Sequence, residues 1–448
     1  MNDATRATRT VEPSLAERLI EQQFERAGGE LLVDGHRVGD LLDCFGSPLF
    51  VYRAQTMRDA VRDLRRATHG RFDIHYSIKA NPNPAVIALM AGEGAGAEVA
   101  SAAEYECARR AGIAPQRILF AGPAKSAAEL AHVLERGIGE IHVESDQEIE
   151  RLAGLTRRLG LSARVSVRVN PDSAAQGGSM RMGGRPTQFG FDEESIDEVA
   201  MLLDSTPGLT LVGVHMFAGT QILDADTLLG QWRHGLAVAA RIGALIGRPL
   251  ATVDLGGGLG IPIFKSDRPL DLERLHAGLV ELLAGLDDDP FLSQARLIIE
   301  PGRFLAGPAG IYLARVNALK RSKGETFIVT DGGMHHHLAA SGNLGQVLKK
   351  DYPLVLANRL DDADRHPATV CGPLCTPLDV IGRQAALPRA QVNDIVAVLQ
   401  SGAYALSASP VGFLSHPMPA ELLVDGRELR VIRRRGSFEH PITEPEPP

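Results

Sequence analysis

The chain has 448 residues, which is enough for two domains with separate hydrophobic cores. Its 44% of apolar and 23% of charged residues are typical of a soluble protein, and its net charge of -8 argues against a nucleic-acid-binding surface. Four scattered cysteines are too few for a disulfide framework and fit a cytoplasmic protein. The N-terminus lacks the apolar core of a signal peptide and no apolar run could span a bilayer, so no membrane partner is expected.

Residues 1–47 predict a small N-terminal unit. We expect residues 1–12, which are polar, to be disordered. An amphipathic helix begins after the capping residue Ser14 and closes at Gly28-Gly29, and a hairpin with an Asp-Gly turn follows at residues 31–38. Part of this unit is expected to join a later β domain.

Between residues 48 and 304, strand and helix patterns alternate regularly, after a short strand at 49–52 and a helix over 54–68. Eight strand–helix units over about 240 residues predict an α/β fold, a closed (β/α)8 barrel of the TIM type. The strands are expected at 74–79, 97–100, 118–121, 140–143, 164–169, 212–217, 252–255 and 297–300. Helices are expected between them, for example at 102–111, 127–136, 146–159, 194–204 and 227–245. An open doubly wound sheet is less favoured, because no strand leads into a full G-x-G-x-x-G motif.

After residue 304 the pattern changes to short strands separated by turns. This predicts a second, mainly β domain over residues 305–440, and the Pro- and Glu-rich residues 441–448 predict a disordered tail. Its strands are expected at 311–316, 326–330, 368–370, 394–399, 421–424 and 428–432. Within the barrel, residues 170–190 form a long glycine-rich insertion, and loops of this length are usually functional.

Lys79 stands at the end of the first barrel strand. Apolar residues alternate with more polar ones from Phe72 to Ile78, and Pro82 then stops strand pairing because proline has no N–H to donate. The carboxyl ends of barrel strands face the ligand. A lysine amine there can form a Schiff base with a carbonyl cofactor; the alternative is a surface lysine at a strand end.

The seventh and eighth strands also end in candidate binding groups. Consecutive glycines at 256–258 allow backbone N–H groups to approach a phosphate, which barrels commonly hold at this position; the alternative is a tight turn without a ligand. Glu300 can keep a ring nitrogen protonated, and Arg303 can bind an anion. The alternative for these two residues is a structural ion pair.

Three candidates lie at the end of the sixth strand. Phe217 is placed to lie flat on a planar ligand, and Thr220 is placed to donate to a phosphate. His215 alternates to the same side as Phe217. A satisfied core histidine accounts for His215 at least as well as a catalytic one.

The second domain adds histidines, cysteines and a tyrosine. Residues 335–337 are three histidines that cannot all face one ion from a regular element, so we predict a loop with one histidine at the site and no metal. Cys371 and Cys375 lack the second ligand pair of a zinc site, and a cysteine in this Gly-Pro turn is a better candidate for an acid or nucleophile. Tyr404 could reach a phosphate or fill the core.

Together these segments resemble the fold-type III pyridoxal-phosphate (PLP) decarboxylases, the family that contains diaminopimelate and ornithine decarboxylases. The similarity covers residues 45–425, nearly the whole chain. It rests on Tyr-Ser-Ile-Lys-Ala-Asn at 76–81, Gly-Gly-Gly at 256–258, Glu-Pro-Gly-Arg at 300–303, Gly-Pro-Leu-Cys at 372–375 and Gly-Ala-Tyr at 402–404. Each motif is modest alone, but their order and spacing are highly specific.

The resemblance implies a PLP cofactor and assigns residues to it. The family's cofactor-bearing lysine corresponds to Lys79 and its carboxylate at the pyridine nitrogen to Glu300, while Glu98 lies near the cofactor's face and Glu104 beyond it. The phosphate contacts correspond to Gly257, Gly258, Gly302, Arg303, Thr220 and Tyr404. Cys375 matches a cysteine that the partner subunit contributes near the substrate carbon, which implies a homodimer with composite active sites.

The chain departs from the family pattern at three places. Phe217 replaces the ring-stacking histidine, and Thr376 replaces the acid that recognises a distal amine. The histidines at 335–337 replace an arginine and a tyrosine of diaminopimelate decarboxylases. The chain is therefore most similar to a secondary-metabolite branch, in which some members act on amino acids tethered to an acyl carrier protein or built into a siderophore precursor.

The expected activity is removal of the α-carboxylate from an amino acid or an amino-acid-derived, carrier-tethered substrate. The candidate residues are Lys79, Glu300 and Cys375 for catalysis, and His215, His336 and Thr376 for substrate contacts. The alternatives are a diaminopimelate decarboxylase, an amino-acid racemase on the same fold and a non-catalytic relative. Glu300 argues against the racemase, because alanine racemases place an arginine at the ring nitrogen. Retention of the catalytic residues argues against the non-catalytic relative.

Overall fold

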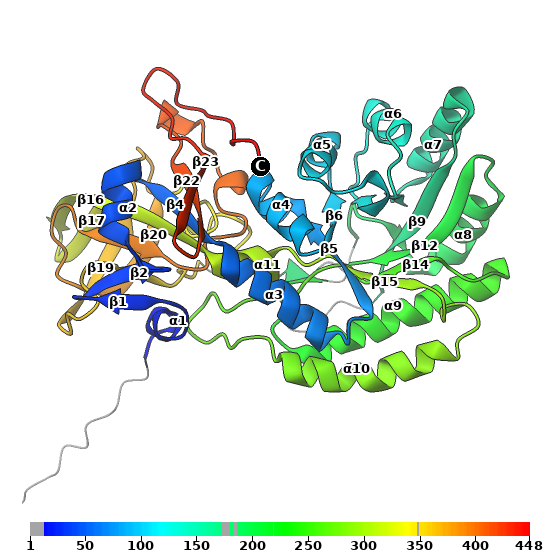
Figure 1. Cartoon of the computed structure of the whole chain (residues 1–448), viewed down its shortest axis with the longest axis horizontal. Coiled ribbons are helices and arrows are strands. Elements are labelled where there is room, and N and C mark those ends of the chain that lie inside the picture. Colours follow the sequence, from blue (N-terminus) through cyan, green and yellow to red (C-terminus); the bar gives the residue numbers. More distant parts are fainter. Residues whose placement is uncertain (1–12, 173–179, 182–185, 218, 347–348) are drawn as a thin grey trace, which may run out of the picture.

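The computed structural model describes residues 13–172, 180–181, 186–217, 219–346 and 349–448. Residues 1–12, which we expected to be disordered, and much of the 170–190 insertion lie outside the described residues. Figure 1 shows a barrel with its helices on the right and a β domain on the left. No helix within the described ranges is both long enough and apolar enough to cross a membrane.

Within the described residues, eight parallel strands close into a barrel, as the sequence predicted. Their hydrogen-bonded order is β9-β12-β14-β15-β5-β6-β7-β8, and β8 pairs with β9 to complete the ring. The strands are β5 (Phe72–Ser77), β6 (Gly96–Val99), β7 (Ile118–Phe120), β8 (Glu140–Val143), β9 (Ala163–Asn170), β12 (Leu209–Met216), β14 (Thr252–Asp254) and β15 (Arg296–Ile299). Because all eight run in parallel, their carboxyl ends gather at one mouth.

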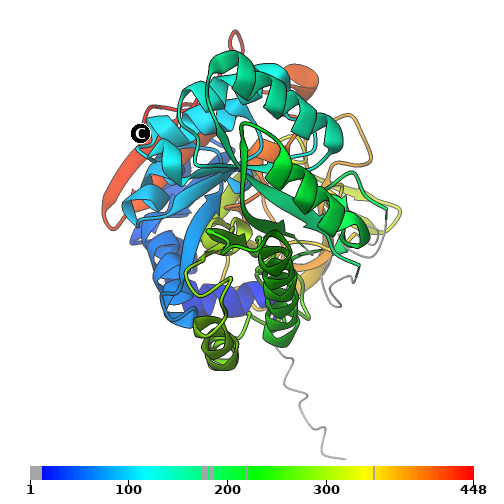
Figure 2. The ribbon, with the colours of Figure 1, turned by 90° about the vertical axis from the view of Figure 1, so that its right-hand side faces the viewer.

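Eight helices of the described chain surround these strands, as Figure 2 shows from the barrel side. They are α3 (Ala54–Ala67), α4 (Pro84–Gly92), α5 (Ala102–Arg110), α6 (Ala127–Glu135), α7 (Asp146–Leu159), α8 (Ile196–Ser205), α9 (Ala225–Ile246) and α10 (Leu272–Asp287). Serine side chains cap α5, α6 and α7 by accepting backbone N–H groups of the first turn. Helix α3 precedes the first barrel strand and packs between α10 and α4, so it completes the ring of helices.

The second domain is built on a sheet with the order β20-β19-β17-β16-β4-β22-β23; β21 pairs with β16, and β18 pairs with β21. Its strands are β4 (Leu49–Arg53), β16 (Gly310–Ser322), β17 (Glu325–Thr330), β18 (Leu354–Leu356), β19 (Arg365–Cys371), β20 (Val380–Pro388), β21 (Ile395–Val398), β22 (Ala420–Asp425) and β23 (Glu428–Arg433). We expected the barrel domain to begin at residue 48 and therefore to include β4. This was wrong, because β4 pairs with β16 and β22 and so belongs to the β domain.

The N-terminal unit packs on the β domain. Its elements are α1 (Leu15–Gln23), β1 (Glu25–Ala27), β2 (Glu30–Val33), β3 (His36–Arg37) and α2 (Val38–Phe45). Leu19 of α1 and Leu31 of β2 share a hydrophobic core with Val51 of β4 and Leu313 of β16. Helix α1 ends at Gln23 rather than at Gly28, because the intervening residues form β1 and pair with β2.

The C-terminal segment is ordered against the edge strand β23, which corrects the expected disordered tail at 441–448. The Glu446 N–H donates to the Ile432 carbonyl at 2.9 Å, and Arg430 donates to the Pro447 carbonyl at 2.8 Å. An edge strand offers unpaired backbone groups, and the proline-rich segment covers them.

Candidate active site

Lys79 lies at the barrel mouth, in the single helical turn Ile78–Ala80 that follows β5. Its Nζ donates to both carboxylate oxygens of Glu98, at 3.0 and 2.9 Å. Ser77 Oγ donates to Glu98 Oε2 at 2.5 Å and so fixes the carboxylate. The Lys79 side chain is 48% exposed, whereas that of Glu98 is 2% exposed, so a buried carboxylate presents an accessible amine.

The charges around Lys79 keep its amine protonated. Burial among protein atoms would lower the pKa of Lys79, but Glu98, Tyr404 and Glu300 outweigh burial and raise the pKa above its ordinary value. Glu104 sits behind this pair, where its carboxylate accepts the Ala100 N–H at 2.7 Å. Burial raises the pKa of Glu104.

Glu300 follows β15 and is 6% exposed. Its Oε2 lies 3.4 Å from Nε2 of His215, whereas its Oε1 has no hydrogen-bond partner among the described residues. Burial would raise the pKa of Glu300, but His215, His142 and Lys79 lower it well below its ordinary value. A buried, ionised oxygen without a donor is unusual, and Oε1 fits an N–H donor on a ligand. The neighbouring Asp254 carboxyl also shares a hydrogen bond with Glu300.

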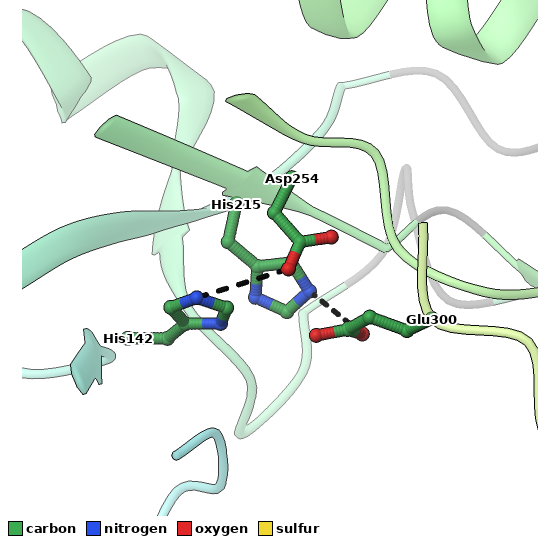
Figure 3. Close-up of side chains that lie close together, drawn as sticks. All are labelled: His142, His215, Asp254 and Glu300. Carbon is green, nitrogen blue, oxygen red and sulfur yellow. Dashed lines mark ion pairs between the residues drawn. The ribbon is translucent and has the colours of Figure 1, made fainter. Parts of the chain in front are cut away.

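Glu300 belongs to a cluster with His142, His215 and Asp254 inside the barrel (Figure 3). These side chains come from β8, β12, β14 and the end of β15, and one donor atom of each lies within 4.8 Å of the others. Imidazoles and carboxylates are donors that a divalent cation accepts, but Glu300 is also the carboxylate assigned to a ring nitrogen. His142 and Asp254 were not among the residues predicted from the sequence. Their signal was a histidine or an aspartate within a short strand of the predicted barrel.

The loops after β14 and β15 need glycine for reasons of packing. Gly256 and Gly258 have positive φ angles of 68° and 98°. A Cβ on Gly257 would lie 2.5 Å from the Glu300 carbonyl, and a Cβ on Gly302 would lie 2.9 Å from Ala80 Cβ. The glycines therefore bring backbone next to Glu300 and the Lys79 turn, and their contact with a phosphate stays a prediction.

Arg303 and Tyr404 lie beside the Lys79 turn. The Tyr404 N–H donates to the Ala80 carbonyl at 2.8 Å, and the Arg303 guanidinium lies 4.7 Å from the centre of the Tyr404 ring. Arg303 Nη1 donates to the Tyr352 hydroxyl at 3.4 Å, while its buried Nε has no partner among the described residues. A cation with an unused donor at the mouth fits an anionic ligand group.

Phe217 and Thr220 follow β12. Both are half-buried, and the Phe217 ring packs so closely on Gly256 that a Cβ at this glycine would lie 3.2 Å from it. Thr220 lies in β13 (Gly219–Thr220), which pairs with β10 (Met180–Arg181). Their contacts with a ring and a phosphate stay predictions.

Residues 54–307 match the family model described as pyridoxal-dependent decarboxylase, pyridoxal binding domain. The chain belongs to the fold-type III PLP-dependent decarboxylases. The L-glutamyl-[BtrI acyl-carrier protein] decarboxylase of Niallia circulans is 36% identical to this decarboxylase over 410 residues, which are 91% of this chain and 95% of that protein. A diaminopimelate decarboxylase of Aquifex aeolicus is 30% identical over 426 residues, covering 94% and 97% of the two chains.

The fold agrees with this assignment. The crystal structure of diaminopimelate decarboxylase from M. jannaschii in complex with L-lysine has a TM-score of 0.85 at 25% identity, covering 93% of this chain and 96% of that one. The chain is therefore a carboxy-lyase of this family, with the predicted barrel and β domain.

The remaining predicted site residues of the decarboxylase lie in the β domain. Cys375 is exposed and not in a disulfide, and Thr376 follows it in the loop between β19 and β20. His336 is 1% exposed, and its Nδ1 lies 3.2 Å from the Tyr312 hydroxyl. The His336 ring is buried in the β domain, and its contact with substrate stays a prediction. His215 likewise faces Glu300 from within the barrel instead of the open mouth.

Proposed function

We propose that this decarboxylase binds PLP at the barrel mouth through Lys79 and removes the α-carboxylate of an amino acid carried on an acyl carrier protein. The observation that carries the cofactor assignment is the buried Glu300 Oε1, which lacks a donor within the described chain. The N–H of a protonated pyridine ring would satisfy it. Lys79, Arg303 and the glycine loops offer an amine and an anion site at the same mouth.

Each residue has a distinct role in this proposal. Bound PLP supplies the electron sink for the electrons that remain after loss of CO2. Lys79 anchors the cofactor, and Glu98, at 2.9 Å from Nζ, accepts and returns the amine proton. Glu300 holds a proton on the ring nitrogen. Arg303, Thr220, Tyr404 and the backbone at Gly257, Gly258 and Gly302 would bind the phosphate, and Phe217 would contact the ring.

The proton that replaces the carboxylate comes from Cys375 of a second subunit. Within one chain, Cys375 lies in an exposed loop of the β domain rather than in the barrel. We therefore infer a homodimer in which this loop completes the partner's site. Sedimentation of the PLP-loaded protein tests the dimer, and a monomer with full activity contradicts it.

The substrate assignment rests on the loop that carries Thr376. A hydroxyl at this position has no charge to pair with a distal ammonium group, which argues against free diaminopimelate or ornithine. The relative with 36% identity is named for glutamate on a carrier protein. A diaminopimelate decarboxylase is the second candidate, because relatives of that name align over nearly the whole chain.

The deciding experiment measures CO2 release by the PLP-loaded enzyme. The panel contains L-glutamyl and other aminoacyl carrier proteins, free L-glutamate, L-ornithine and meso-diaminopimelate. We expect turnover of a tethered substrate and little of the free acids. Turnover of free diaminopimelate alone would favour the second candidate. A protein that takes up no PLP, with the same spectrum as Lys79→Ala, would refute the enzyme assignment.

Variants of Thr376 test the specificity argument separately. Thr376→Glu restores a carboxylate, so it should raise the kcat/KM for free diamino acids relative to the tethered substrate. Thr376→Ser keeps the hydroxyl and is the matched control. Equal specificity of all three proteins would remove Thr376 from substrate recognition.

A further inference from the structure

Resting on the proposed PLP site, we propose that His215 is a positioning residue that binds Glu300 Oε2 from inside the barrel and leaves Oε1 directed at the cofactor ring. The two oxygens of Glu300 have different surroundings. Oε2 lies at an ion-pair distance of 3.4 Å from His215 Nε2, which has no nearer hydrogen-bond partner among the described residues. Oε1 is buried without a hydrogen-bond partner there. A carboxylate held by one oxygen cannot rotate freely, so the other oxygen keeps its direction.

The barrel strands fix this arrangement. His215 on β12 is the direct register partner of Asp254 on β14, and Asp254 pairs with Ile298 on β15. The Glu300 N–H donates to the Gly256 carbonyl at 2.9 Å, which ties Glu300 to the chain just after Asp254. His215 thus approaches Glu300 from a strand interior rather than from a loop.

His142 supports His215 from the other side. The two rings lie 4.3 Å apart, and His142 Nε2 lies 3.5 Å from Glu140 Oε1 and 3.8 Å from Asp254 Oδ2. Hydroxyl groups of Ser166 and Thr252 donate to Glu140. Glu140 therefore has its own hydrogen-bond donors inside the barrel, and His215 Nε2 faces Glu300 instead.

The protonation of the cluster agrees with this role. Burial lowers the pKa of His215 to about 4, so a neutral ring can donate its Nε2 proton to Glu300. Asp254 Oδ1 accepts the Gly256 N–H at 2.8 Å, and the Asp254 carboxyl shares a side-chain hydrogen bond with Glu300. Burial and the Glu300 charge raise the pKa of Asp254. Of the two neighbouring carboxyl groups, Asp254 holds the proton and Glu300 the charge.

The test compares PLP-loaded wild type, His215→Phe and His215→Asn. Phenylalanine keeps a ring but removes the donor, and asparagine returns an N–H donor. Protein reconstituted with PLP labelled with 15N in the ring reports protonation of the ring nitrogen by NMR. We expect His215→Phe to move the 15N signal towards the unprotonated position and to lower kcat by about tenfold or more. PLP affinity should change by less than about threefold, and His215→Asn should recover part of both losses.

Asp254→Asn tests whether the Asp254 carboxyl is neutral. Asparagine reproduces the shape of a protonated aspartate, so the 15N signal should stay at the wild-type position. A wild-type signal and kcat in His215→Phe would show that His215 only fills the core. A stoichiometric metal ion that is lost in His215→Phe would make the cluster a metal site and also overturn the proposal. Failure of wild type to bind PLP would instead refute the proposed function.

Discussion

His337 should make this decarboxylase less stable in mild acid. Its buried ring accepts the Ala340 N–H at Nδ1, at 3.2 Å, and its Nε2 lies 3.0 Å from Ser401 Oγ. Ser401 Oγ donates to the Val398 carbonyl at 2.8 Å, so it accepts the Nε2 proton. The neutral ring is therefore fully bonded, and a proton on Nδ1 would face the Ala340 N–H. Burial and the nearby Arg303 lower the pKa of His337 to about 3.

The size of the effect follows from linkage. The unfolded chain binds a proton at His337 with the ordinary pKa of 6.5, whereas the folded chain binds it only near 3. The stabilisation is complete above pH 6.5 and is lost as the pH falls towards 3. At about pH 5.5, one unit below the unfolded pKa, binding to the unfolded chain lowers the free energy of unfolding by about 1.4 kcal/mol.

Equilibrium urea unfolding at about pH 7.5 and about pH 5.5 measures this loss. His337→Asn keeps an acceptor for Ala340 but cannot titrate, so it should lose about 1.4 kcal/mol less than wild type between the two pH values. His440→Asn removes an exposed imidazole and should behave as wild type does. The same pH dependence in wild type and His337→Asn would refute the argument, whatever the absolute stability of the variant.

Three further changes test other parts of the molecule. Glu300→Gln should retain PLP but lose CO2 release by about tenfold or more, because an amide cannot hold the ring proton; wild-type turnover would contradict this. Cys375→Ala should release CO2 but protonate its product incorrectly, and an unchanged product distribution by mass spectrometry would remove Cys375 from the mechanism. Glu421→Ala should cost about 3 kcal/mol or more in urea unfolding, because the Tyr52 hydroxyl (2.6 Å), Asn83 amide (3.0 Å) and Arg433 guanidinium (2.6 Å) all donate to this buried carboxylate. A fall in the free energy of unfolding of less than about 1 kcal/mol would show that water replaces the Glu421 carboxylate as the acceptor.

The barrel could be predicted because its signals are local. The barrel strands are short and mostly apolar, and helices alternate with them along the chain; this pattern does not depend on distant residues. Lys79 and Glu300 stand out because charged residues at the carboxyl ends of such strands face a ligand. The pairing of β4 is different. Its apolar sequence fits either domain. Its domain is set by its pairing with β16 and β22, which lie more than two hundred residues later in the chain.

The cluster of His142, His215, Asp254 and Glu300 inside the barrel could not be predicted from the sequence. His142 and Asp254 lie in short strands that also contain Glu140 and Thr252, and a sequence does not show that four strands bring such side chains to one point. The closure of the barrel creates this contact, since β8 and β14 are not neighbours in its ring. Function that depends on such closure is visible only in three dimensions.

Asp379 links two loops of the β domain at which the chain departs from the family pattern. Its carboxylate accepts the Met334 N–H at 2.6 Å and the Leu374 N–H at 2.9 Å, so it joins the loop that leads into the three histidines to the loop that carries Cys375 and Thr376. These are two of the three places where the chain departs from the family pattern. Because one buried carboxylate holds both loops, a shift in either is transmitted to the other. Both departures therefore lie in one hydrogen-bonded part of the β domain, outside the barrel that carries Lys79 and Glu300.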